Sequence, residues 1–182
     1  MKELELPISD QTIAALNAGD MVYLTGIIYT ARDAAHKKLA ELIEAGKELP
    51  FEFSGQAVFY AGPSPAKPGR PTGSIGPTTA GRMDLYAPLL ISRGLKIMIG
   101  KGLRSAEVTE AIVKYRGIYF AATGGIAALM AKCVTASKLI AFEELGTEAI
   151  RELTVEKLPV VAAIDCRGQN LYENGRKKYS LF

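Results

Sequence analysis

Apolar residues along the chain fall into short clusters of two kinds, separated by polar and glycine-rich segments. Continuous apolar runs rich in β-branched and aromatic residues predict buried strands. Clusters that repeat every three or four residues, such as Ala35, Leu39, Leu42 and Ile43, predict helices with one buried face. The expected strands are Met21–Ile28, Ala57–Ala61, Lys96–Ile99, Ile118–Ala122, Lys138–Phe142 and Val160–Ile164. The expected helices are 30–46, Met83–Ser92 (with Pro88 causing a kink or a late start), Ser105–Tyr115 and a segment of small residues ending at Cys133.

Strands that alternate with helices predict an α/β fold with a parallel or mixed sheet. The length of 182 residues favours a single domain spanning residues 1–182. A hydrophobic content of 48% and a charged content of 23% are typical of globular proteins. The apolar runs are too short to cross a bilayer, and the first residues form no apolar signal region, so we expect a cytoplasmic protein without membrane contact.

The segment 62–81 interrupts this alternation because prolines and glycines crowd into it. A structureless segment of this length within a domain is typical of a functional loop, although an interdomain linker has a similar composition. The loop ends in the segment 76–84, which reads Gly-Pro-Thr-Thr-Ala-Gly-Arg-Met-Asp and is expected to open a helix. Its threonine hydroxyls, its free backbone N–H groups and Arg82 could hold an anion, or could belong to an ordinary capped helix.

Two further cations follow expected strands. Arg32 stands at the start of a helix, where a positive charge is unfavourable unless it meets an anion, and His36 lies one turn further on the same face. Lys101 stands between Gly100 and Gly102, directly after a strand end, where α/β folds place ligands. A misplaced surface arginine, a structural histidine and a solvated lysine in a plain turn are the alternatives.

The cations and hydroxyls together fit a small dicarboxylate, because each arginine can form a forked pair with one carboxylate. A strong acid or base is missing from the set, which contains the single histidine and no pair of carboxylates. The residues that carry this hypothesis are Arg32, Thr78, Thr79, Arg82 and Lys101.

Metal and nucleic-acid sites find little support. Cys133 and Cys166 are far apart and form no CxxC pair, so zinc or an iron–sulfur cluster held by this chain alone is not expected. Cys133 has apolar neighbours and is interpreted as a buried, inert thiol. A net charge of +3, scattered apart from Lys37-Lys38 and the tail 176–178, does not indicate nucleic-acid binding.

Longer motifs identify a family. The sequence resembles the β subunit of the class I fumarase / L-tartrate dehydratase family, from residue 19 to about residue 172. The resemblance rests on Thr30-Ala31-Arg32-Asp33-Ala34-Ala35-His36, Tyr60-Ala61-Gly62-Pro63, the segment 76–84, Met98-Ile99-Gly100-Lys101-Gly102 and Thr123-Gly124-Gly125.

This resemblance implies a swivelling β/β/α domain with three layers and reversible hydration of fumarate to L-malate. It also implies a [4Fe–4S] cluster whose three cysteine ligands belong to a separate α subunit. The chain is therefore expected to be active only in a hetero-oligomer, for example α2β2.

The resemblance also assigns roles within the site. Arg32, Arg82 and Lys101 resemble contacts to the substrate carboxylates, with Thr79 beside them, and Thr78 resembles the base that removes the C3 proton of malate. His36 matches a histidine treated as an active-site group in some members, or it only buttresses Arg32, and Asp33 is expected to hold Arg32. The acid partner would lie on the α subunit.

The small residues Ala80 and Gly81 before Arg82 resemble the fumarase branch of the family, since the tartrate dehydratases tend to carry bulkier residues there, and this resemblance implies fumarate as the substrate. The alternatives are an L-tartrate dehydratase β subunit, which would yield oxaloacetate, and a stand-alone dicarboxylate-binding module.

Overall fold

The computed structural model describes residues 2–180, which form a mixed α/β structure. The strands are β1 (Lys2–Glu5), β2 (Met21–Thr30), β3 (Ala57–Phe59), β4 (Ile97–Gly100), β5 (Ile118–Ala121), β6 (Val134–Ala141) and β7 (Ile150–Ile164). The helices are α1 (Asp10–Ala15), α2 (Asp33–Glu44), α3 (Ala87–Ser92), α4 (Ala106–Tyr115), α5 (Ala127–Lys132) and α6 (Leu171–Tyr179). Two 3-10 helices are η1 (Ala80–Met83) and η2 (Glu143–Glu148).

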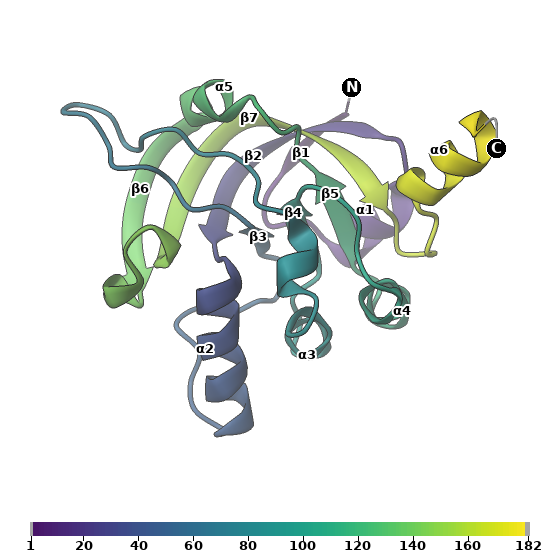
Figure 1. Ribbon diagram of the computed structural model, residues 1–182, viewed down its shortest axis with the longest axis horizontal. Helices are drawn as coiled ribbons and strands as arrows, with labels where there is room; N and C mark the ends of the chain where they lie inside the picture. Colours follow the sequence, from purple (N-terminus) through teal and green to yellow (C-terminus); the bar gives the residue numbers. More distant parts are fainter. Residues whose placement is uncertain (1, 181–182) are drawn as a thin grey trace.

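The sheet closes on itself. Strands β2, β3, β4 and β5 are parallel neighbours, and β7 pairs antiparallel with both β5 and β2. These five strands form a closed barrel, while β1 and β6 extend the sheet outside it (Figure 1). The mixed sheet expected from the sequence is thereby confirmed.

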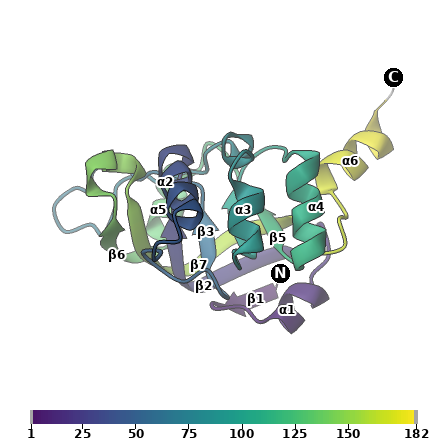
Figure 2. The ribbon, with the colours of Figure 1, turned by 90° about the horizontal axis from the view of Figure 1, so that it is seen from below.

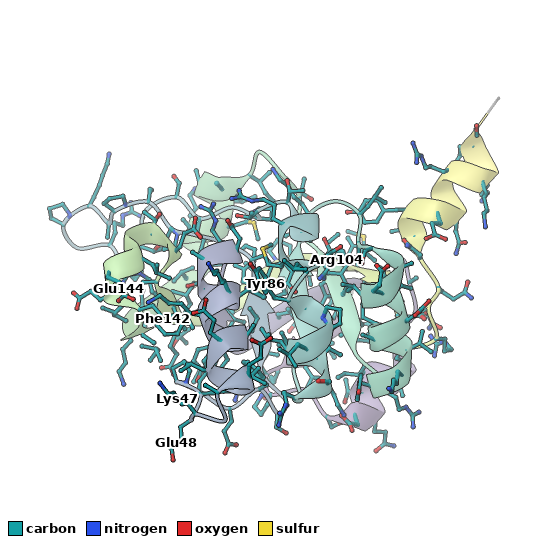
Figure 3. The ribbon with its side chains drawn as sticks, turned by 60° about the horizontal axis from the view of Figure 1, so that its bottom comes forward. Lys47, Glu48, Tyr86, Arg104, Phe142 and Glu144 are labelled. Atoms are coloured by element: carbon teal, nitrogen blue, oxygen red, sulfur yellow. The ribbon has the colours of Figure 1, made fainter. Side chains whose placement is uncertain are left out.

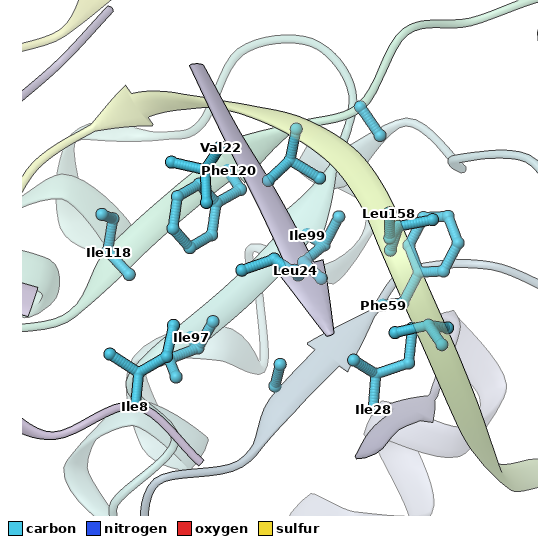
Figure 4. Packing of buried hydrophobic residues seen from close by; sticks show 14 of the residues in the cluster. Ile8, Val22, Leu24, Ile28, Phe59, Ile97, Ile99, Ile118, Phe120 and Leu158 are labelled. Carbon is cyan, nitrogen blue, oxygen red and sulfur yellow. The ribbon is translucent and has the colours of Figure 1, made fainter. Parts of the chain in front are cut away.

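Alternating side chains of the barrel strands fill two separate cores. On β4, Ile97 and Ile99 join the cluster inside the barrel, whereas Met98 joins the cluster under the helices. Phe59 and Phe120 point inward in the same way (Figure 4). This two-residue alternation is what a strand buried on both faces requires.

Helices α2, α3 and α4 lie side by side over one outer face of the barrel (Figure 2). Leu39 of α2, Leu90 of α3 and Ile112 of α4 are fully buried there. Strand β2 ends just before α2, while β3 and β4 end before the loops that lead to η1 and α4. The candidate site lies at these strand ends.

The structure departs from the sequence prediction most clearly at β7. The prediction covered only its apolar end, Val160–Ile164, but the strand begins at Ile150. Its first half carries charged residues that alternate with buried ones, such as Leu153 and Val155. The continuous-run criterion misses such a strand because only one of its faces is buried. Strand β1 and helix α6 were not predicted either.

The start of α2 also differs from the prediction. The helix was expected over 30–46, but its N-cap residue is Arg32, whose side chain makes no capping hydrogen bond, and α2 covers Asp33–Glu44. The Thr30 hydroxyl instead donates to the Ala149 carbonyl and accepts from the Arg151 N–H, so it fastens β2 to β7. Among residues 2–180, no helix is both long and apolar enough to span a membrane.

Candidate active site

The end of the proline-rich loop forms a short backbone ladder beside strands β3 and β4. The Thr78 N–H donates to the Tyr60 carbonyl at 2.6 Å, and the Lys101 N–H donates to the Thr78 carbonyl at 3.2 Å. The Ala80 N–H then donates to the Lys101 carbonyl at 2.8 Å. Thr78, Thr79 and Lys101 are therefore fixed next to one another by main-chain bonds, although they are distant in sequence.

The helix expected to open in the segment 76–84 is only the four-residue 3-10 helix η1. The α-helical part, α3, begins later, at Ala87, with Pro88 in its first turn, so the late start is the outcome that the structure shows. A single 3-10 turn carries little macrodipole, because few peptide dipoles add up along it. Attraction of an anion to this segment therefore depends on Arg82 and Lys101 rather than on a helix end.

One carboxylate connects the two arginines of the site. Oδ2 of Asp33 accepts from Nη2 of Arg82 at 2.8 Å, and Oδ1 of Asp33 lies 3.7 Å from Nη2 of Arg32. Asp33 was expected to hold Arg32, but its shorter contact is with Arg82. Both guanidinium groups are thus within reach of one carboxyl group, which places them in a single cationic patch.

Arg32 is held by a residue that the sequence analysis did not single out. Its Nη2 lies 3.0 Å from Oε1 of Glu148, and the other oxygen of Glu148 accepts from the Ala34 N–H at 3.2 Å. Glu148 ends η2, which lies beside α2; Figure 3 shows Phe142 and Glu144 next to this helix. Lys38 of α2 pairs with Glu144 and lies over the Phe142 ring. The two contacting segments are more than a hundred residues apart, so no local pattern could have revealed this pair.

His36 lies beneath the patch rather than in it. Its side chain is fully buried, Nδ1 lies 2.9 Å from the Arg32 carbonyl, and its ring meets Tyr60 edge-on. Because a carbonyl oxygen can only accept, Nδ1 carries the proton. Burial lowers the pKa of His36 to about 4, so the ring is neutral at neutral pH. This position favours the buttressing role over contact with a substrate.

The burial of His36 makes stability depend on pH. Since its pKa is 6.5 in the unfolded chain and about 4 in the folded one, the unfolded state binds the extra proton as the pH falls between these values. We expect the contribution of His36 to the free energy of unfolding to be complete above pH 6.5. As the pH falls from 6.5 to 4, protonation of His36 in the unfolded chain should lower the free energy of unfolding by about 3 kcal/mol.

Urea denaturation at a series of pH values measures this effect. The matched control is His36→Asn, whose amide can still donate to the Arg32 carbonyl but does not titrate, and it should flatten the slope between pH 6.5 and pH 5. An equal slope in the two proteins would contradict the assignment to His36.

Lys101 is exposed, and its side chain runs along the loop after β5. A Cβ placed on Gly124 would lie 3.6 Å from Cδ and 3.8 Å from Nζ of Lys101. These are ordinary contact distances, so Gly124 lies directly beside the end of the Lys101 side chain.

The cationic patch lies on an open surface. Hollows of about 450 Å³ and 470 Å³ run along the proline-rich loop, between it and β6, η2 or α5. Neither of these two hollows is lined by Thr78, Arg82 or Lys101. The patch offers groups that bind a small anion, with Arg82 and Lys101 exposed and Arg32 and Asp33 half-buried.

Within residues 2–180, no group of three or more His, Cys, Asp or Glu side chains is arranged to hold a metal ion. Cys166 is buried, whereas Cys133, expected to be buried, is half-buried and ends α5. Burial raises the pKa of the Cys133 thiol and so makes it a poorer metal ligand.

Comparison with known proteins gives one family match and two groups of relatives. Residues 2–175 match the family described as "Fumarase C-terminus". The chain is 42% identical to the anaerobic class I fumarate hydratase of Escherichia coli K12, over 95% of this chain but only 31% of that protein. The chain thus spans about a third of the length of the fumarate hydratases that it matches.

The second group has nearly the length of this chain. A putative L(+)-tartrate dehydratase subunit beta of Methanocaldococcus jannaschii is 37% identical, over 94% of this chain and 91% of that protein. The L(+)-tartrate dehydratase subunit beta of Escherichia coli K12 is 32% identical, over 98% of this chain and 90% of that subunit.

Proposed function

The chain belongs to the Fumarase C-terminus family, with homologues among class I fumarate hydratases and L(+)-tartrate dehydratase β subunits, and on this premise we propose that it is the β subunit of an iron–sulfur-dependent hydro-lyase. Together with an α subunit, it would hydrate fumarate reversibly to L-malate. Two observations carry this proposal: Arg32 and Arg82, which come from separate segments, share the carboxylate of Asp33, and backbone hydrogen bonds join Lys101 to Thr78 in the segment that also carries Arg82.

The patch supports binding of a dicarboxylate. Arg32 and Arg82 are joined through Asp33, so each guanidinium keeps donors available in a fixed orientation. A substrate carboxylate would compete with Asp33 for Arg82. The flexible side chain of Lys101, whose backbone is bonded to Thr78 and Ala80, would add a second positive charge for the substrate. Thr79, exposed beside Lys101, would donate its hydroxyl to the same substrate.

Thr78 is proposed as the base that removes the C3 proton of malate. A threonine hydroxyl needs a lowered pKa to serve as a base, and positive charge lowers the pKa of an oxygen acid. Lys101, bonded to Thr78 through the backbone, and Arg82, four residues along, are the cations that would supply this effect. His36 would act from below by fixing the backbone of Arg32 through the hydrogen bond from Nδ1.

The [4Fe–4S] cluster implied by the family would supply a Lewis-acidic iron for the substrate hydroxyl, from the α subunit. Residues 2–180 offer no ligand set for it, and the Cys133 and Cys166 thiols do not fit the task. The role of this chain is then to bind and orient the dicarboxylate and to move the C3 proton.

An open patch without enclosing walls fits a subunit whose site is completed by another chain. The two relatives of similar length are named as beta subunits, which supports a partner subunit here. We propose a hetero-oligomer such as α2β2. In it this domain would swivel against the α subunit and close the patch over the substrate.

The second candidate is dehydration of L-tartrate to oxaloacetate. It is favoured by the near-complete coverage of the two tartrate dehydratase β subunits. By contrast, the small pair Ala80-Gly81 within η1 resembles the fumarase branch of the family and favours fumarate. The kcat/KM values for fumarate and for L-tartrate, measured with one reconstituted complex, decide between them: a larger value for fumarate supports the first candidate, and a larger value for L-tartrate supports the second. Dicarboxylate binding without any turnover would favour the stand-alone binding module instead.

A further inference from the structure

Arg104 is a buried cation that the proposed reaction does not use. It precedes the first turn of α4, and its side chain has no exposed surface, although arginine is rarely buried unless it is paired. Figure 3 shows Arg104 inside the molecule beside α4. A residue of this kind requires a specific set of partners.

Its partners come from four segments. Nε of Arg104 donates to Oδ1 of Asp84 at 2.7 Å, and the guanidinium lies 5.2 Å and 5.0 Å from the ring centroids of Tyr60 and Tyr119. Nη1 lies 3.6 Å from Sδ of Met98, whereas Nη2 has no hydrogen-bond partner within residues 2–180. The burial is thus only partly compensated, and replacing the whole Arg104–Asp84 pair by apolar side chains of similar volume would be expected to cost little stability, whereas removing the arginine alone would leave the largely buried carboxylate of Asp84 without its cation.

Three of the partners of Arg104, namely Asp84, Tyr119 and Tyr60, are bonded to segments of the proposed active site. Asp84 ends η1, two residues after Arg82, and its Oδ2 accepts from the Ser105 N–H at 2.6 Å. The Tyr119 hydroxyl donates to the Gly102 carbonyl at 3.0 Å, next to Lys101. The carbonyl of Tyr60 accepts from the Thr78 N–H. Arg104 therefore links the backbone of Thr78, of Arg82 and of Lys101 from below.

Gly100 shows how tightly this cluster is built. A Cβ at position 100 would lie 2.9 Å from Cδ2 of Tyr60, closer than real Cβ atoms approach, and 3.1 Å from Cβ of Ala80, which is an unusually tight contact. The glycine lets Tyr60 and η1 close on the end of β4, immediately before Lys101. Small displacements of Arg104 would thus be transmitted to the residues that carry the proposed chemistry.

We propose that Arg104, clamped by Asp84 between Tyr60 and Tyr119, is the positioning residue that sets the geometry of Thr78, Arg82 and Lys101. This inference rests on the proposed function for its effect on turnover, but the clamp itself is a property of the chain alone. Arg104 touches no substrate and acts only through the two segments that it joins.

The test compares Arg104→Met, which keeps most of the volume, with the control Arg167→Met. Arg167 also pairs with a buried aspartate, Asp165, but binds the end of α1 and neither segment of the site. Hydrogen exchange of the isolated chain should speed up at residues 78–84 and 100–105 in Arg104→Met and stay unchanged there in Arg167→Met. The double variant Asp84→Asn/Arg104→Met removes both charges and keeps the test usable if the single variant does not fold.

In the assembled enzyme, Arg104→Met should lower kcat/KM about 100-fold, the scale of a misplaced catalytic group, while Arg167→Met stays near wild type. Adding Arg104→Met to Thr78→Val should cost less than the product of the two separate losses, because part of the effect of the arginine passes through the threonine and the rest through Arg82 and Lys101.

Full kcat/KM in Arg104→Met, or unchanged exchange at 78–84, would overturn the inference. An inactive wild-type complex would instead overturn the proposed function, and the exchange data would still decide on the clamp.

Discussion

Thr78→Val is expected to lower kcat for fumarate hydration by the assembled enzyme about 1,000-fold, the usual contribution of a positioned acid or base. Valine matches threonine in shape, so the variant removes the hydroxyl without opening a cavity. The main-chain bonds of Thr78 to Tyr60 and Lys101 do not involve the hydroxyl and should persist. The loss should therefore appear in kcat, with KM changed little.

The matched control for this variant is Thr78→Ser, which keeps the hydroxyl and should retain most of the activity. Steady-state rates from fumarate absorbance measure both variants. If Thr78→Val and Thr78→Ser were equally active, Thr78 would not be the base, and the proton would be moved by a group on the α subunit.

Arg82→Met is expected to lower kcat/KM about 100-fold, because a charge-assisted, forked contact to one substrate carboxylate is lost. Arg82→Lys should recover part of this loss, since it restores the charge but not the fork. In either variant Asp33 loses its 2.8 Å partner and keeps only the longer contact with Arg32. We therefore expect KM to rise more than kcat falls.

Arg93→Met is the matched control, because this substitution removes the same net charge at an exposed residue that follows the last turn of α3. It should leave both constants unchanged. An equal loss in Arg82→Met and Arg93→Met would indicate that only the overall charge of the surface matters, and would contradict a specific contact.

Most strands of the sheet could be predicted from the sequence, because strands buried on both faces are continuous apolar runs. The strands around Phe59, Ile99 and Phe120 were predicted in this way, and the helices that follow them were predicted from their own composition. The closure of the barrel was not predictable, because it requires one strand, β7, to pair with both β5 and β2, and the part of β7 that pairs with the end of β2 contains charged residues such as Glu152. A strand with one solvent-exposed face has no continuous apolar run, so it is mistaken for a polar segment when only such runs are used to find strands.

The residues that carry chemistry were found more readily than those that hold them. Arg32 and Lys101 stand out because a cation at a helix start or between glycines after a strand is locally unusual. Glu148 and Arg104 act through partners distant in the chain or through burial, and neither property leaves a local signal. The backbone ladder that brings Thr78 to Lys101 is likewise a tertiary feature that composition cannot reveal.

We propose that this chain is one half of a hydro-lyase whose other half is a cluster-bearing α subunit. The direct test is anaerobic titration of the chain into a fixed amount of an iron–sulfur-reconstituted α subunit, with fumarate consumption followed by absorbance. We expect no turnover by either chain alone and a rate that rises to a plateau at one β chain per α chain. Full activity of the α subunit alone, or no activity of the mixture with either fumarate or L-tartrate, would contradict it.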